Sequence, residues 1–383
     1  GTMGDLTNFS WIGLPINLTS LFRNFDHGPN LTIDLHREPS RVMEQEDNFR
    51  GLLGKLGTYY TPVLAPVGVI CNIACIVIFL STALKKVSCT CYMAAIALCN
   101  SMFLLTFFLI WLSKYDIQAY NTPGLCQLLT LLSCTSNFLS CWYAVFLAID
   151  RYILLFHKPL KTLCTTIAAK IFIIVAAAFA VAIHINVSLT VDVQLIPGQG
   201  HLCLPLSIHM DALNVLGKVD VFFNVVFAYA LLVTFCCLTW IGLCCKPQKL
   251  KQLQRTGNKH KLQIMFSRAS SLYLLFFLFF CAPSQMVRIY CTLRELCGQN
   301  KPNYYLYSIQ QLLQYPYYTG FALGAVVYLV SLSVARDALK AACLKLYRRS
   351  KLLTHSRTPV GSLATHTVIA MTEITNLKNV SLL

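Results

Sequence analysis

Two charged residues, Asp150 and Arg151, close a long apolar run, and they are the residues of this chain best placed to do chemistry. The run begins near Cys126, and Arg151 follows that cysteine by 25 residues (151 − 126). A helix rises about 1.5 Å per residue, so this separation corresponds to about 37 Å, more than the roughly 30 Å core of a bilayer. A charge pair at the end of such a helix costs several kcal/mol unless it is paired or wetted, and it therefore usually has a function.

Other kinds of chemistry find no support in the sequence. No group of residues has the spacing of a catalytic site or a metal site, so we expect a protein that is not an enzyme and that needs no metal or other cofactor. The net charge of +16 would suggest nucleic acid as a partner only if it were evenly spread. Instead, 21 of the 31 Lys and Arg lie in segments expected at one membrane face, and 12 of the 15 acidic residues lie elsewhere. This asymmetry predicts cytoplasmic basic segments that meet lipid headgroups and a cytosolic partner.

The elements that must position the charge pair are apolar and long. The 383 residues are 56% hydrophobic and 12% charged, and the mean hydropathy is +0.60, as is typical of a membrane protein. Seven segments are long enough to span a bilayer. We therefore predict an all-α membrane protein with a bundle of seven transmembrane helices over residues 57–332. The expected spans are 59–84, 91–112, 126–156, 167–190, 213–245, 262–290 and 305–332.

The region before the bundle, residues 1–56, is polar and acidic. It contains three acceptor sequons for N-glycosylation, at Asn8, Asn17 and Asn30. Three sequons in one short tail favour a glycosylated, extracellular N-terminus. An odd number of spans then places the C-terminus in the cytosol.

The region after the bundle has two parts. Residues 333–347 are amphipathic at helical spacing and predict a short eighth helix on the inner membrane surface. Cys343 in this segment is a candidate for palmitoylation. Residues 348–383 are rich in Ser and Thr and are expected to be disordered.

Between the fourth and fifth spans, the sequence predicts a β-hairpin. Residues 191–195 and 201–204 alternate apolar side chains on either side of a Pro-Gly-Gln-Gly turn. Further along, Cys291 and Cys297 flank the expected third outer loop and are candidates for a disulfide in an oxidising compartment.

Together, these residues resemble a rhodopsin-like G-protein-coupled receptor over roughly residues 59–347. The similarity rests on Cys126 and on the Asp150-Arg151-Tyr152 triplet at the end of the third span. Asn72 in the first span, Pro283 in the sixth and Tyr328 in the seventh also match the family. The resemblance implies a disulfide from Cys126 to Cys203 in the hairpin, and Asp150, Arg151 and Tyr152 as the contact for a heterotrimeric G protein.

The resemblance also implies an activation hinge at Cys281, Pro283 and Tyr328, where the sequence departs from the family. Cys281 replaces a tryptophan, and Gly324-Ala325 replaces the Asn-Pro of the seventh span. In the second span, Asn100 replaces an aspartate. The fourth span lacks its tryptophan and the fifth its proline. Because the family's aspartate and asparagine help to hold a sodium ion, we expect no sodium site here.

Candidate ligand contacts follow from helical counting in the outer halves of the spans. Ser133 stands where amine receptors carry an aspartate, and Tyr318 stands where opsins carry the retinal lysine, so neither of those ligands is expected. A wide polar and aromatic mouth with charges of both signs suits an extracellular peptide, such as a neuropeptide or peptide hormone. The candidate residues are Trp111, Gln127, Ser133, Asn137, Asp220, Gln285, Arg288, Gln310, Gln314 and Tyr315.

The leading interpretation is therefore a peptide-activated receptor at the plasma membrane that signals to a G protein, with arrestin and receptor kinases acting on its Ser/Thr-rich tail. A scavenger or arrestin-biased receptor that signals poorly through G proteins is the main alternative, favoured by the altered hinge residues. A receptor for a non-peptide ligand also stays open. A transporter would require internal repeats, and none is visible.

Overall fold

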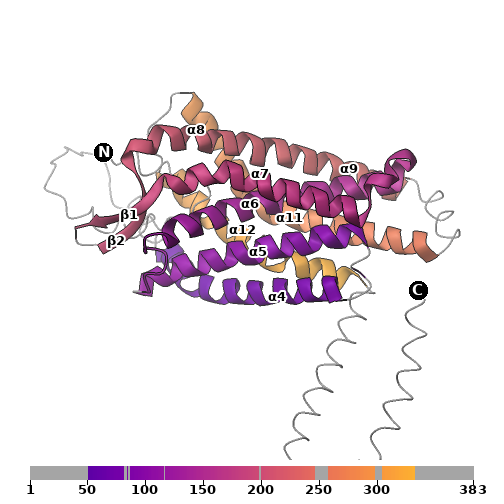
Figure 1. Cartoon of the computed structure of the whole chain (residues 1–383), viewed down its shortest axis with the longest axis horizontal. Helices are drawn as coiled ribbons and strands as arrows, with labels where there is room; N and C mark the ends of the chain where they lie inside the picture. The colour runs from indigo at the N-terminus through magenta and orange to yellow at the C-terminus, as the bar shows by residue number, and fades with distance from the viewer. Residues whose placement is uncertain are drawn as a thin grey trace, which may run out of the picture. The chain divides into compact units, whose positions relative to one another are not determined.

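The computed structural model describes residues 51–81, 84, 87–115, 117–197, 200–245, 258–297 and 304–332. Long helices dominate this part of the chain (Figure 1). The elements are α4 (Thr61–Ser81), α5 (Ser88–Leu112), η4 (Ser113–Tyr115), α6 (Leu125–Phe156), η5 (Lys158–Leu163), α7 (Thr166–Leu189), β1 (Val191–Ile196), β2 (Gly200–Pro205), η6 (Ser207–His209), α8 (Met210–Asp220), η7 (Val221–Phe227), α9 (Ala228–Cys245), α11 (Asn258–Leu296) and α12 (Tyr304–Ser331).

Six helical stretches in the described part of the chain are long and apolar enough to cross a membrane. Their lengths suit a bilayer, and helices satisfy every backbone hydrogen bond internally, as an apolar solvent demands. The 28-residue α12 is the seventh helix of the predicted bundle, and it is more polar because Gln310, Gln311 and Gln314 lie in its first half. The six stretches are Gly51–Leu80, Ser88–Leu112, Leu125–Phe156, Thr166–Leu189, Ser207–Leu243 and Leu262–Leu296.

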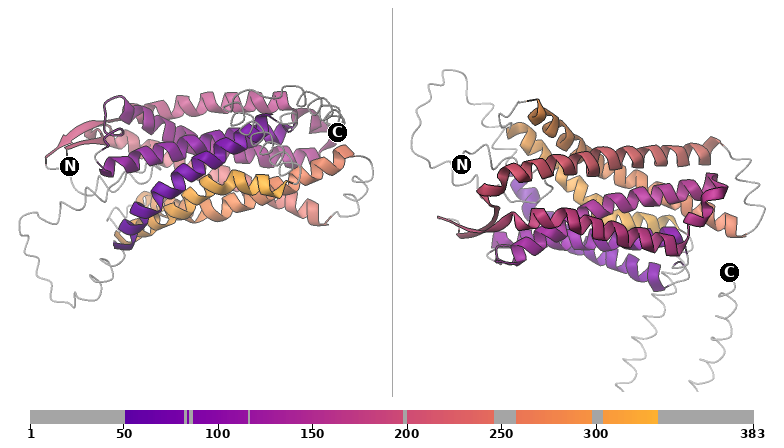
Figure 2. Two further views of the ribbon diagram at one scale, coloured as in Figure 1. Left: turned by 90° about the horizontal axis from the view of Figure 1, so that it is seen from below. Right: turned by 45° about the horizontal axis from the view of Figure 1, so that its top comes forward.

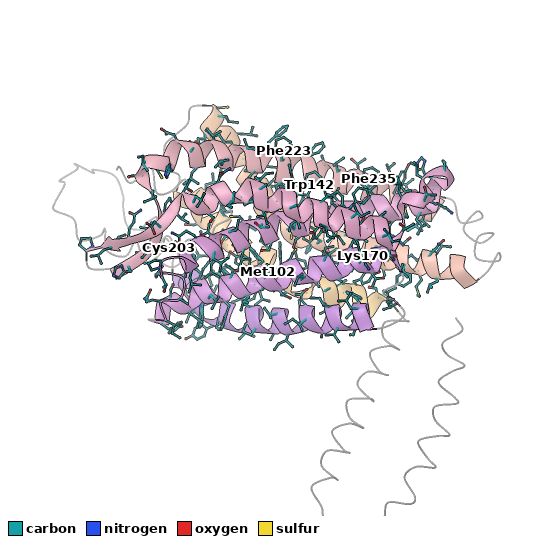
Figure 3. All side chains as sticks on the ribbon, in the orientation of Figure 1. Met102, Trp142, Lys170, Cys203, Phe223 and Phe235 are labelled. Carbon is teal, nitrogen blue, oxygen red and sulfur yellow. A yellow bond between two sulfur atoms is a disulfide. The ribbon has the colours of Figure 1, made fainter. Side chains whose placement is uncertain are left out.

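The third long helix, α6, is the centre of the bundle. It packs against α5, α7, α9 and α11, while α4 packs between α5 and α12. In two further views the long helices lie alongside one another, and the hairpin lies at one end (Figure 2). We call this the hairpin end, and we call the opposite end, where α6 finishes, the Arg151 end. Cys203 lies at the first and Lys170 towards the second (Figure 3).

Aromatic side chains fill the middle of the bundle. Phe103 of α5 contacts the rings of Tyr317, Tyr318 and Phe321 of α12, and Phe277 of α11 joins the same cluster. By contrast, many large apolar residues of α7 are exposed, as expected of a helix that faces lipid.

Small residues set the closest helix contacts. A Cβ on Gly68 would lie 2.7 Å from the Cβ of Ala322 and 2.7 Å from Cδ1 of Leu104, so glycine is required for α4 to approach its neighbours this closely. A Cβ on Gly324 would lie 2.9 Å from Cε2 of Tyr273. The ring of Tyr273 therefore packs against the glycine that replaces the family's asparagine.

The predicted hairpin is present. Strands β1 and β2 pair antiparallel, with Val193 opposite Cys203, and Gly200 supplies a positive φ of 82° at the turn. Cys203 is bonded to Cys126 at the start of α6, with the Cα atoms 5.7 Å apart. The backbone N–H of Cys203 also donates to Oδ1 of Asn121 at 3.0 Å. The disulfide and this hydrogen bond fix the hairpin to the start of α6 and to the loop that precedes it.

The fifth helix departs from a regular α-helix. Residues Val221–Phe227 form a π-helix between α8 and α9. Such turns are rare, and many lie at functional sites. Asp220 directly precedes this turn and so lies where the helix changes its winding.

Candidate functional site

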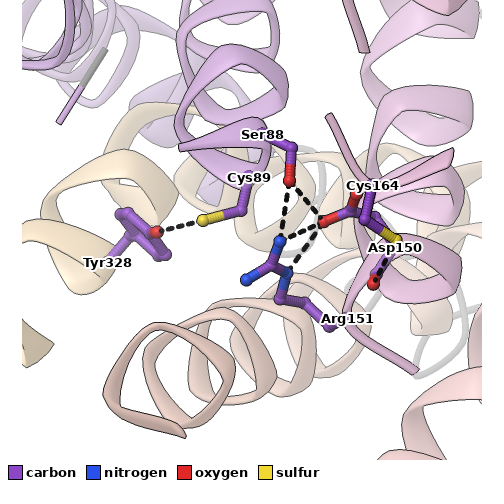
Figure 4. Close-up of polar contacts among 6 residues, drawn as sticks. All are labelled: Ser88, Cys89, Asp150, Arg151, Cys164 and Tyr328. Carbon is purple, nitrogen blue, oxygen red and sulfur yellow. Dashed lines mark hydrogen bonds and ion pairs between the residues drawn. The ribbon is translucent and has the colours of Figure 1, made fainter. Parts of the chain in front are cut away.

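At the Arg151 end, the predicted charge pair is buried and joined to α5 (Figure 4). Arg151 is 1% exposed, and both its Nε and its Nη2 donate to Oδ2 of Asp150. Nη2 also donates to Oγ of Ser88 at 2.9 Å, and that hydroxyl donates to Oδ2 of Asp150 at 3.0 Å. The three side chains thus form a closed polar ring, which offsets the cost of burying the charges. Nη1 of Arg151 has no hydrogen-bond partner in the described part of the chain.

Two thiols extend this cluster. Cys89 Sγ lies 3.4 Å from Oη of Tyr328, which links α5 to α12. Cys164, in the turn after η5, donates to the backbone oxygen of Asp150 at 3.4 Å. Burial, above all, raises the pKa of the Cys164 thiol to about 12, so this thiol stays protonated and can donate at neutral pH.

The third residue of the predicted triplet lies apart from the ring. Tyr152 packs against Phe156, His157 and Phe235, and its Oη lies 3.2 Å from Nε2 of His157. The structure therefore joins the side chains of Asp150 and Arg151 to Ser88 of α5. It places Tyr152 against Phe235 of α9 instead.

The acidic partner of Arg151 belongs to its own helix. The only acidic residue of α11 is Glu295, close to the hairpin end of that helix. Its Arg151 end carries Lys259, Lys261 and Arg268 instead. Because no acidic residue lies between Leu262 and Arg268, no ion pair joins this described part of α11 to Arg151.

Two of the predicted hinge residues, Cys281 and Pro283, lie in α11, whereas the third, Tyr328, lies in the cluster at the Arg151 end. Pro283 is inside α11, and Cys281 is fully buried. Asn100 Oδ1 accepts from Oγ of Ser140 at 2.8 Å, whereas Nδ2 of Asn100 and Oη of Tyr273 have no hydrogen-bond partner among the described residues. Asn100, Ser140 and Tyr273 are neutral, and the expected absence of a sodium site stays a prediction.

At the hairpin end, two predicted ligand contacts instead bind each other. Nη2 of Arg288 donates to Oδ2 of Asp220 at 2.6 Å, and the side chains are 5% and 16% exposed. Nε2 of His184, from α7, lies 3.9 Å from the other carboxylate oxygen. A second ion pair, between Lys218 and Glu295 at 3.0 Å, joins α8 to α11 nearer the hairpin end of the bundle. Two ion pairs therefore hold the fifth helix to the sixth.

Several of the other candidate ligand residues also have partners within the chain. Trp111 Nε1 donates to the backbone oxygen of Gly57 at 2.8 Å. Gln127 Nε2 donates to Oδ1 of Asp192 in the hairpin at 3.1 Å. Asn137 Oδ1 accepts from Oη of Tyr317.

On α12, Gln314 Oε1 accepts from Oη of Tyr318 at 3.1 Å, and Tyr315 Oη donates to the backbone oxygen of Leu53 at 3.3 Å. Ser133 and Gln310 are buried. Gln285 is also buried, and its Oε1 lacks a hydrogen-bond partner among the described residues.

The expected bridge between Cys291 and Cys297 is wrong, because both thiols are free. We expected a loop between them, but α11 continues to Leu296. Six residues of helix separate two Cα atoms by about 9 Å along the axis, beyond the reach of a disulfide.

Other predicted sites lie outside the described residues. These are the sequons at Asn8, Asn17 and Asn30, the amphipathic segment 333–347 with Cys343, and the tail 348–383. They stay predictions.

Sequence reasoning missed several residues of the cluster around Arg151 and of the ion pairs at the hairpin end. His184 carried a signal, because a histidine inside an apolar span usually has a polar partner. Ser88, Cys89, Lys218 and Glu295 carried none, since ordinary residues at helix ends give no indication of their contacts.

The comparison with known proteins agrees with this geometry. The family described as 7 transmembrane receptor (rhodopsin family) matches residues 71–316, which is more than half of the chain. The chain therefore belongs to the rhodopsin family of seven-transmembrane receptors. Cys126, Arg151 and Pro283 lie within the matched region. No curated protein was found to match the chain.

Proposed function

We propose that the chain is a plasma-membrane receptor that binds an extracellular peptide and activates a heterotrimeric G protein. The observation that carries this proposal is the buried ring of Ser88, Asp150 and Arg151 in a chain of the rhodopsin family. A buried arginine whose acidic partner lies on its own helix can turn towards an incoming protein without breaking an ion pair between helices.

The orientation of the receptor in the membrane follows from the distribution of its basic residues. The basic segments at the Arg151 end suit the cytosol, and the disulfide-bonded hairpin suits an oxidising exterior. The N-terminal tail would then be extracellular, with sugars on its sequons, and the C-terminal tail cytoplasmic. That tail would offer hydroxyls to receptor kinases and arrestin, and its amphipathic segment, with a palmitoylated Cys343, would lie on membrane lipid.

A peptide suits the hairpin end better than an amine. The candidate contacts come from α5, α6, α8, α11 and α12 and include amides, aromatic rings and charges of both signs. Ser133 offers no carboxylate to an amine. Ligand binding would shift α11 about Pro283, open the Arg151 end and release Arg151.

The experiment is a cell-surface screen with peptide libraries and a second-messenger readout, run on the parent chain and on Arg151→Ala. We expect active peptides on the parent and equal surface expression but no signal from the variant. Peptide binding without any G-protein response in the parent would contradict the coupling part of the proposal.

One observation favours a second candidate, a receptor that binds ligand but signals weakly through G proteins. Tyr273 packs directly against Gly324, and Cys281 replaces the family's tryptophan, so the hinge region differs from that of the family. Such a receptor would recruit arrestin upon peptide binding and give little second messenger.

A further inference from the structure

Two buried groups on α11 lack hydrogen-bond partners, and they are of complementary kinds. Gln285 is 7% exposed and Arg288 is 4% exposed. Oε1 of Gln285, an acceptor, and Nε of Arg288, a donor, make no hydrogen bond within the described part of the chain. Buried polar groups nearly always make hydrogen bonds, so we expect each of these two atoms to have a hydrogen-bond partner.

The two groups are near each other. Residues three apart on a helix share one face, with Cβ atoms about 5–6 Å apart. Pro283 is N-terminal to both, and the ion pair Asp220–Arg288 joins Arg288 to the end of α8. Both atoms are closed to solvent in this structure, so a single small group of a ligand contacts both of them once the side chains that cover them move aside.

The charges of Arg288 and Asp220 limit which ligand group can bind beside Gln285. The positive charge of Arg288 is already balanced by Asp220 at 2.6 Å, and Asp220 also faces His184. A carboxylate would add a negative charge beside Asp220 and would set its oxygens against the Gln285 oxygen. An ammonium group would be repelled by the positively charged guanidinium of Arg288. The favoured group is neutral and carries one acceptor next to one donor.

We infer that Gln285 and Arg288 recognise a carboxamide group of the ligand. Its carbonyl oxygen accepts from Nε–H of Arg288, and its N–H donates to Oε1 of Gln285. The carboxamide is either the amidated C-terminus of a peptide or the side chain of an Asn or Gln. This inference rests on the proposed function, because it specifies the ligand of the same receptor.

The experiment uses the full chain in lipid nanodiscs and three peptide pools of matched sequence. One pool ends in a carboxamide, one in a free carboxylate, and one in a free carboxylate preceded by Asn or Gln. Peptides retained by the receptor are counted by mass spectrometry. We expect at least tenfold enrichment of one carboxamide-bearing pool over the plain acid, because a site built to bond a donor rejects an analogue that lacks it. The first pool reports a terminal amide and the third a side-chain amide.

Variants separate recognition from folding. Gln285→Lys replaces the acceptor with a cation and should shift the preference towards the free acid, an outcome that mere loss of structure would not give. Gln285→Glu keeps an acceptor and should keep the preference for the carboxamide. The control is Ser207→Lys, which adds the same charge at an exposed residue that follows the hairpin; its preference should match that of the parent.

Retention of plain acid and carboxamide pools in equal amounts by the parent would overturn the inference and leave the peptide-receptor proposal intact. If no pool is retained by a correctly folded parent, the proposed function fails, and the inference fails with it. If Gln285→Lys keeps the parent's preference, Gln285 is not the acceptor.

Discussion

Breaking the ion pair between Asp220 and Arg288 should lower the stability of the bundle strongly. Asp220→Asn keeps the shape of the side chain but leaves Arg288 buried without its counter-charge. The side chains are only 16% and 5% exposed, so solvent screens the pair little. Removing one partner of a buried pair costs about 3–5 kcal/mol. At about 2–4 °C per kcal/mol for a domain of some 150–250 residues, the midpoint of thermal unfolding should fall by about 6–20 °C.

The neighbouring pair supplies a matched control. Lys218 and Glu295 join the same two helices, but their side chains are 31% and 18% exposed. Lys218 is about a third exposed, so solvent screens this pair more and it contributes closer to the roughly 0–1 kcal/mol of a surface pair; Lys218→Gln should then lower the midpoint by about 4 °C at most. Exchanging the charges in Asp220→Arg with Arg288→Asp should recover part of the loss.

The assay is thermal unfolding of the purified chain in detergent, followed with a thiol-reactive fluorescent dye. The chain has 18 cysteines, several of them buried in helices, so unfolding exposes many reactive groups. If Asp220→Asn unfolds at the same temperature as Lys218→Gln, the buried pair does not stabilise the bundle, and the reasoning from burial is wrong.

Three further predictions use the same molecule. Gly68→Ala should cost about 1–3 kcal/mol because its Cβ would clash between α4 and α12, whereas Gly54→Ala, with nothing within 4 Å of its Cβ, should not lower the unfolding midpoint. Ser88→Ala removes the hydroxyl of the polar ring and should raise basal G-protein activation; Thr90→Ala, which removes a buried hydroxyl without a hydrogen-bond partner among the described residues, should leave it unchanged. Agonist affinity should be the same in sodium as in an equal concentration of a bulky organic cation, because Asn100 offers no charge; a loss of affinity specific to sodium would show that a site exists.

The sequence predicts the helices of this fold well, because hydropathy depends on local composition. Long apolar segments can satisfy their backbone only as helices in a bilayer, so span number and approximate limits follow directly. The hairpin also follows from local alternation and from the turn that includes Gly200. The disulfide from Cys126 to Cys203 came from the resemblance, and the structure confirms it.

The contacts between helices were not predictable in the same way. Asp220 and Arg288 were both expected to face a ligand, but their mutual distance depends on how α8 and α11 are rotated and packed. The error at Cys291 and Cys297 has a similar origin. The polar end of α11 reads as a loop in sequence, whereas the helix continues to Leu296, and its Glu295 forms an ion pair with Lys218.

The central claim, that Arg151 passes activation to a G protein, is tested most directly by nucleotide exchange. The purified receptor in nanodiscs is mixed with heterotrimeric G proteins and the peptide pool that it retains best. The parent should accelerate exchange at least tenfold over receptor-free vesicles. Arg151→Ala should retain the pool equally and give no acceleration. Equal acceleration by the variant and the parent would contradict the account.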